Sequence, residues 1–221
     1  MAITINGDGT LTGISVGGLP DGIVDTDMLA ADAVSAAKLK SDAIEAGDLP
    51  AGSILQVVSS TTDNTGQVTC NDNTADISFS YLTLDITPVS SSSTIYVSWH
   101  LPGEMSNDGA TYNSMMYIRR RVGSTNTYLR PDAAGSRNRG MVQLTTGYVD
   151  FNANSTIEQF TMTNYPDTHG VTAGTEITYF PVLENRGGSN ATWYYNRTVT
   201  DTDADTTERG RSWIMAMEVA G

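Results

Sequence analysis

The sequence is poor in the side chains from which most enzyme sites are built. Its 221 residues include one cysteine, Cys70, and two histidines, His100 and His169. A single cysteine excludes an intrachain disulfide and any site built on a cysteine pair within one chain. Two histidines leave few arrangements for acid-base or metal chemistry. We therefore expect a protein that is not an enzyme and that has no cofactor and no metal site.

Positive charge and long apolar runs are scarce as well. Twelve Lys and Arg stand against 25 Asp and Glu, and the formal net charge is -13. That balance is the opposite of the basic surface with which proteins neutralise phosphates. No run approaches the roughly 20 apolar residues of a membrane span, and the N-terminus lacks the basic and then apolar stretch of a secretory signal. We expect a soluble chain with no nucleic-acid partner, no membrane insertion and no secretory processing.

The composition changes near residue 51. Residues 1–51 hold both lysines but no arginine and no aromatic residue, whereas all ten arginines and all aromatics lie in residues 52–221. Because aromatic side chains contribute the largest apolar areas to a core, the first part has little with which to build one. The sequence predicts an N-terminal extension, residues 1–51, followed by one domain, residues 52–221.

Apolar residues recur at every fifth position of the extension: Val24, Leu29, Val34, Leu39, Ile44 and Leu49. A five-residue step turns about 140° around an α-helix and alternates faces in a strand, so neither element keeps these side chains on one side. Their full burial returns roughly 10–18 kcal/mol. Ordering about 30 residues costs roughly 30–60 kcal/mol of backbone entropy. We expect these six residues to pack against identical copies of the chain about a symmetry axis.

Residues 3–14 precede this repeat and place Asn6-Gly7-Asp8-Gly9 between two short apolar runs. Asn-Gly and Asp-Gly are strong hairpin signals. Two interpretations stay open: an unstructured terminus, or a sheet edge that adds to the sheet of a partner.

Beyond residue 52 the apolar residues alternate with polar ones, and clusters of Ser, Asn, Asp, Gly and Pro separate the runs. Such runs occupy residues 77–81, 95–101, 112–122, 141–151, 156–163, 175–184, 191–199 and 211–219. Alternation with a period of two is typical of half-buried strands. The pattern predicts about ten strands in a mainly β fold, an antiparallel, jelly-roll-like β-sandwich.

Several loops and strands carry residues suited to contact with a ligand or with another surface. Arg137 and Arg139 lie in a loop rich in Gly, Ser and Asn, and Arg186 lies in a similar loop at residues 185–190. Trp193 and Tyr195 belong to an aromatic run in which an outward ring would stack on a sugar, although core or intersubunit packing is the preferred interpretation for that run. These five residues are the candidate contact residues.

Two charged clusters are given structural interpretations. In Arg119-Arg120-Arg121 the middle side chain of a strand points away from its neighbours, and we expect pairing with carboxylates across a subunit interface rather than glycan or phosphate binding. Residues 201–208 hold four carboxylates, and an enzyme that cleaves glycans would need two of them as a pair. They lack the Gly and the bidentate Glu of an EF-hand calcium loop. We expect a solvated acidic loop.

Three segments resemble a known family. Gly52-Ser53-Ile54-Leu55-Gln56-Val57-Val58, Leu84 to Val97 with its run Ser90-Ser91-Ser92-Ser93, and the stretch from Trp213 to Gly221 ending in Met217-Glu218-Val219-Ala220-Gly221 are similar to segments of phage tail-fibre and virion-appendage domains. Residues 12–22 and Ala37-Lys38-Leu39 resemble the N-terminal parts of the same fibres. These domains are common in marine and cyanobacterial phages.

The resemblance implies a homotrimer in the virion, with its N-terminal segment bound to other virion proteins of the tail or capsid and its β domain outward as a knob. It implies a tail fibre or appendage that attaches to the host surface, with host glycan as a candidate ligand. A head fibre or capsid decoration protein is the alternative, and a glycan depolymerase is a more distant one.

Overall fold

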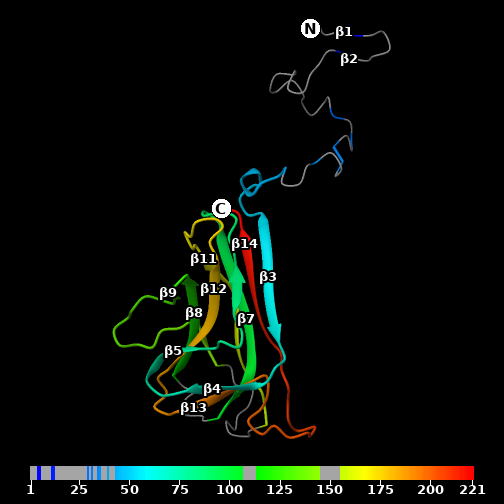
Figure 1. Cartoon of the computed structure of the whole chain (residues 1–221). Helices are drawn as coiled ribbons and strands as arrows, with labels where there is room; N and C mark the ends of the chain where they lie inside the picture. The colour runs from blue at the N-terminus through cyan, green and yellow to red at the C-terminus, as the bar shows by residue number, and fades with distance from the viewer. Residues whose placement is uncertain are drawn as a thin grey trace. The chain divides into compact units, whose positions relative to one another are not determined.

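The computed structural model describes residues 4–5, 11–12, 29, 31, 34–35, 39, 43–106, 113–144 and 155–221. Two compact units divide the chain, Met1–Glu45 and Ala46–Gly221. The boundary therefore lies a few residues before the one predicted from composition. Figure 1 shows the strands of the second unit.

In the first unit, β1 (Thr4–Ile5) pairs with β2 (Leu11–Thr12) in antiparallel register. The hairpin signal of these two segments is confirmed, whereas addition to the sheet of a partner stays a prediction. Four residues of the five-residue repeat are described in this unit, and their exposed fractions lie between 45% and 58%: Leu29, Val34, Leu39 and Ile44. Val24 lies outside the described residues.

The second unit begins with a short 3-10 helix, η3 (Ala46–Asp48), and continues as two antiparallel six-stranded sheets. The first, called the β7 sheet, comprises β3 (Ile54–Thr62), β14 (Ser212–Val219), β7 (Thr94–Met105), β13 (Ala191–Tyr195), β4 (Gly66–Cys70) and β11 (Glu158–Asp167). The second, called the β12 sheet, comprises β10 (Val142–Gln143), β8 (Ser114–Val122), β12 (Ile177–Asn185), β5 (Thr74–Ser78), β6 (Leu84–Ile86) and β9 (Thr125–Leu129).

These two sheets confirm the prediction of a mainly β fold of sandwich type. The predicted run 141–151 is a strand only at β10 within the described part of the chain, since residues 145–151 lie outside it. Among the described residues, no helix has the length and apolar character needed to cross a membrane.

The core lies between the sheets and follows from the alternation of the strands. β14 shows this clearly, because Ile214 and Ala216 are fully buried whereas Trp213 and Met215 on the other face are partly exposed. The aromatic centre of the core is Trp193, whose ring centroid lies 5.2 Å from that of Phe160 and 6.2 Å from that of Phe79. Paired aromatic rings of this kind contribute about 0.5–1.5 kcal/mol beyond their buried area.

Backbone hydrogen bonds join the beginning and the end of the sandwich. Gly52 N donates to Ala220 O at 2.9 Å, and Ala220 N donates to Ser53 O at 2.8 Å. From there β3 and β14 run antiparallel, with Ile54 opposite Val219 and Thr62 opposite Ser212. The residues that lead into the sandwich are thus fixed to one end of the β7 sheet.

Candidate functional site

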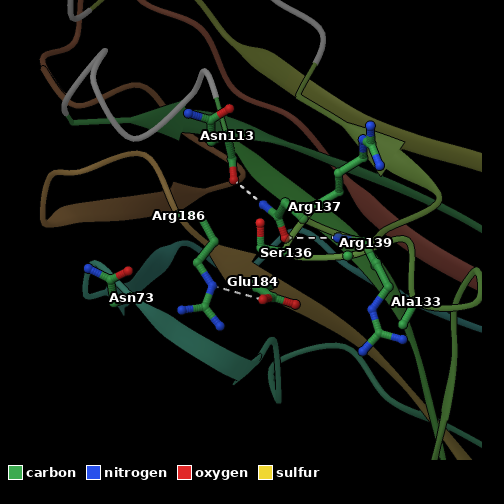
Figure 2. A pocket seen from close by; sticks show the side chains of 10 residues that line it. Asn73, Asn113, Ala133, Ser136, Arg137, Arg139, Glu184 and Arg186 are labelled. Atoms are coloured by element: carbon green, nitrogen blue, oxygen red, sulfur yellow. Dashed lines mark hydrogen bonds and ion pairs between the residues drawn. The ribbon is translucent and has the colours of Figure 1, made fainter.

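A polar pocket of about 560 Å³ lies at one end of the β12 sheet. Its walls come from the residues around the beginning of β5 and β8, the end of β12 and the loop between β9 and β10. The lining residues are Asn73, Asn113, Ala133, Gly135, Ser136, Arg137, Asn138, Arg139, Glu184 and Arg186. Figure 2 shows them from close by. All three arginines that the sequence offered for host contact line this one pocket.

The pairing of β8 with β12 brings these residues together. Ser114 lies opposite Asn185 in the antiparallel register, so Asn113 and Arg186 flank the same end of the pair. The loop after β9 returns along β8, where Met141 N donates to Met116 O at 2.7 Å and Asn138 Nδ2 donates to Asn113 O. Loop residues far apart in the sequence therefore form one concave surface.

Glu184 is the buried acidic group of the pocket. One of its carboxylate oxygens accepts from Arg130 Nη1 at 3.1 Å, and the other accepts from Arg186 Nε at 2.9 Å. The Arg130 guanidinium also stacks over the ring of Tyr117, 5.0 Å from its centroid. Two guanidiniums thus balance one carboxylate and fix its position on the outer face of β12.

Arg137 and Arg139 add positive charge that no described carboxylate balances. Arg137 Nη1 donates to Ala134 O at 3.0 Å, and within the part of the chain that the structure describes no acidic group forms an ion pair with either guanidinium. Figure 2 draws Glu184 between Arg186 and Arg139, whereas Arg137 extends away from it in this view. The pocket therefore has a surplus of positive charge in a chain whose net charge is -13.

A second buried glutamate, Glu218, lies at the other end of the sandwich. Its carboxylate accepts from Ser93 Oγ at 2.6 Å, from Gln56 Nε2 at 2.5 Å and from the backbone N–H groups of Val89 and Ser90 at 3.0 and 3.1 Å. Burial by itself raises the pKa of Glu218, but these hydrogen bonds together outweigh it, so the pKa lies below its usual value. The carboxylate is ionised and held by neutral donors.

His169 completes this cluster and fixes the direction of its hydrogen bonds. Val171 N donates to His169 Nδ1 at 2.9 Å, so the ring proton is assigned to Nε2, which lies 3.1 Å from Ser93 Oγ. Because Ser93 Oγ lies 2.6 Å from a carboxylate oxygen of Glu218, its proton points to Glu218. In a catalytic Ser–His pair the serine hydroxyl donates to the histidine, which removes the proton as a general base. Ser93 donates to Glu218 instead. Burial also lowers the pKa of His169, which keeps the ring neutral.

The two glutamates lie at opposite ends of the sandwich. Glu218 is opposite Ile95 at the beginning of β7, whereas the end of β7 pairs with β13, whose Ala191 lies opposite Cys70. Asn185, beside Glu184, donates to Cys70 O at 2.8 Å. The ten-residue rise from Ile95 to Met105 spans roughly 33 Å at about 3.3 Å per residue. The pocket is therefore far from the end at which residue 54 enters the sheet.

The aromatic candidates lie elsewhere and are corrected by the structure. Trp193 is fully buried in the core and cannot contact a surface ligand. Tyr195 faces the same way and stacks on Tyr81 with ring centroids 3.8 Å apart. The outward member of the run is Tyr194, over which the Arg197 guanidinium lies 4.4 Å from the ring centroid. The preferred interpretation of core packing is confirmed for Trp193.

The arginine run alternates as predicted, but its ion pairs lie within the chain. Arg119 Nη1 pairs with Asp76 at 2.8 Å, and Arg120 Nη1 pairs with Asp167 at 2.6 Å. Arg119 and Arg121 both stack over Phe180, on the outer face of the β12 sheet. The prediction that these arginines find their carboxylates across a subunit interface is wrong for Arg119 and Arg120.

The acidic loop 201–208 lies on the surface, and its Asp201 pairs with Arg209 at 2.7 Å. Within the described ranges, no group of three or more His, Cys, Asp or Glu is arranged to hold a metal ion. The four carboxylates of the loop remain exposed.

The outer face of the β7 sheet is uncharged along β3 and β14, and it is apolar along β14 and at the Ile54 end of β3. Trp213, Met215, Met217 and Val219 lie on this face, opposite Thr61, Ser59, Val57 and Ile54 of β3. Their partners on β7 are His100, Ser98, Tyr96 and Thr94, so the outward positions paired across these three strands include no Asp, Glu, Lys or Arg. Glu104 lies further along β7, opposite Tyr194 of β13. Val57 and Ile54 are more than half exposed. Soluble sandwiches usually cover such a face with polar side chains.

Comparison with known proteins finds no family model that matches this chain and no curated protein that matches it. The sequence singled out Arg137, Arg139 and Arg186 but missed Asn73, Asn113 and Glu184. No local signal marks those three, because only the pairing of β5, β8 and β12 places them in one pocket.

Proposed function

We propose that this chain is a structural protein of a phage virion, a homotrimeric tail fibre or appendage whose β-sandwich attaches to the host surface. The observation that carries the proposal is the pocket lined by Arg137, Arg139 and Arg186 at the end of the sandwich far from residue 54. A receptor-binding protein presents its ligand site away from its point of attachment. The resemblance of three segments of the sequence to phage appendages supports the same function.

The homotrimer is supported by two apolar surfaces that one chain leaves uncovered. The first is the described repeat, Leu29, Val34, Leu39, Ile44 and Leu49, which is exposed throughout. The second is the outer face of β3 and β14. Copies of a chain with a net charge of -13 repel one another, so a face without charged groups is the surface on which they associate most readily. Residues 1–51 would intertwine and bind the particle, and the knobs would pack through the β3–β14 face.

Sedimentation of the full chain tests the trimer. We expect a mass of three copies of 23.6 kDa, and a monomer at micromolar concentration would contradict the proposal. Met217→Glu places a charge in the apolar face and should weaken association. Thr127→Glu, at an exposed position of β9, adds the same charge elsewhere and should leave association unchanged.

The location of the chain on the particle tests the function itself. Gold-labelled antibody against residues 52–221 should mark the tail or its fibres on intact particles in electron micrographs. Label distributed over the capsid would contradict attachment and would indicate a head fibre or capsid decoration protein. Many weak knob contacts on one particle add up through their high effective concentration, so attachment does not need a tight single site.

A further inference from the structure

The chemistry of the pocket defines the class of ligand more narrowly than the proposed function does. Resting on that proposed function, we infer that the pocket binds an acidic saccharide, a sugar that carries a carboxylate, with Arg137 and Arg139 as the carboxylate-binding residues. Its volume of about 560 Å³ lies within the range of about 300–1,000 Å³ typical of small-ligand pockets.

The charges of the pocket favour an anion. Glu184 is already balanced by Arg130 and Arg186, at 3.1 and 2.9 Å. Arg137 and Arg139 have no ion-pair partner among the described residues, and a guanidinium presents a planar fork of donors that matches a carboxylate. In an acidic chain an accumulation of unbalanced arginines repels cations and attracts a ligand of opposite charge.

The remaining groups of the pocket favour a hydroxylated ligand over a bare inorganic anion. Asn73, Asn113 and Asn138 bring side-chain amides, and Ser136 brings a hydroxyl, so the lining can both donate and accept hydrogen bonds. Ring hydroxyls of a sugar need both. Glu184 adds carboxylate oxygens that accept from a sugar hydroxyl, a donor that a sulfate ion lacks. One carboxylate together with several hydroxyls describes a uronic or sialic acid.

Among the described lining residues there is no aromatic ring, so the pocket provides no flat surface for stacking on the apolar side of a neutral sugar. Recognition therefore depends on charge and hydrogen bonds. It should weaken as salt screens the two arginines.

The test uses the full-length protein and matched pairs of probes. Oligosaccharides of glucuronate, galacturonate and N-acetylneuraminate are titrated in parallel with their methyl esters, which keep the hydroxyls and remove the charge, and with inorganic phosphate, which keeps a charge and removes the sugar. Binding is followed by saturation-transfer NMR and calorimetry. We expect at least one of the three acids to bind more tightly than its methyl ester and than phosphate, by a factor of about ten or more.

Variants assign the binding to the pocket. Arg137→Gln and Arg139→Gln should each weaken binding of that acid by about tenfold, because each removes one charge-assisted contact. Arg211→Gln is the matched control, since this exposed arginine pairs with Asp63 outside the pocket and the change in net charge is the same. Thermal unfolding of the three variants shows whether each is folded.

Three outcomes would overturn the inference. The acids bind no better than their methyl esters, phosphate binds as tightly as the acids, or Arg211→Gln weakens binding of the acid as much as Arg137→Gln and Arg139→Gln do. Attachment of labelled protein to host cells separates this failure from failure of the proposed function. If the protein attaches and Arg137→Gln attaches equally well, the chain is an attachment protein and the acidic saccharide is wrong. If the label covers the capsid and no cell is bound, the proposed function itself is wrong.

Discussion

Glu218 and Glu184 are both buried carboxylates near the end of a strand, yet their surroundings are built differently. Glu218 accepts only from neutral donors, a serine, an amide and two backbone N–H groups, in a closed cluster. Glu184 is balanced by two arginines beside an open pocket. The carboxylate of Glu218 is enclosed by the donors that hold it. Glu184 lines a pocket that a ligand can enter.

The two sites also draw on different parts of the sequence. Gln56, Ser93 and Glu218 come from three segments far apart in the sequence, and all three meet in the closed cluster. The pocket, in contrast, is lined by residues outside those segments. The closed cluster therefore joins distant parts of the chain within the sandwich, and the pocket is built from a separate set of residues.

The largest effect is expected from breaking the closed cluster. Glu218→Ala should lower the free energy of unfolding by about 3–5 kcal/mol, because it leaves several buried donors without an acceptor. Urea denaturation measures this loss. Glu176→Ala, at an exposed position just before β12, is the control and should change stability by less than about 0.5 kcal/mol.

Acid should reproduce part of that effect in the unmodified protein. The pKa of Glu218 is lowered in the folded state, so the unfolded chain binds the proton more tightly and stability falls as the pH drops below about 4.3, the ordinary value for Glu. Glu218→Gln has no such titration. The difference in unfolding free energy between the unmodified protein and Glu218→Gln should shrink as the pH falls from 5 toward 3. A difference that stays constant over this range would show that folding does not favour the ionised form of Glu218.

A smaller loss is expected at the pocket. Glu184→Gln should cost about 1–2 kcal/mol, because Arg130 and Arg186 keep contact with water and with an amide oxygen after the charge is removed. Denaturation at neutral pH measures the loss. A loss as large as that of Glu218→Ala would mean that both ends of the sandwich are equally closed.

The smallest effect on stability is expected for Arg137→Gln. Its guanidinium is exposed and donates only to the carbonyl of Ala134 in its own loop, so unfolding free energy should change by less than about 0.5 kcal/mol. Unchanged denaturation together with weaker saccharide binding would separate the ligand site from the fold. A loss above about 1 kcal/mol would place this arginine among the structural residues.

The strands were predictable and the pocket was not, for a physical reason. Alternation within 95–101 and 211–219 is a local signal, and it predicted β7 and β14 because each side chain's face depends only on its neighbours. Loop composition marked Arg137 and Arg186 in the same way. That these arginines line one pocket depends on Ser114 lying opposite Asn185, a pairing across 71 residues that no local pattern specifies.

The aromatic run shows where local reasoning stops. Alternation requires Trp193 and Tyr195 to share a face, but the sequence does not say which face points inward. The structure buries Trp193 against Phe160 and leaves Tyr194 outward, so the two aromatic contact candidates were the inward ones.

The attachment of β3 to β14 has a mechanical consequence. A pull between the residues that enter at Ile54 and a ligand held at the far end of the sandwich runs along β3, not across it. The hydrogen bonds that join β3 to β14 from Ile54 to Thr62 are perpendicular to that pull, so they are loaded in shear, all together, rather than opened one after another. A domain held in this way resists such a pull better than one held through a strand that peels from its end.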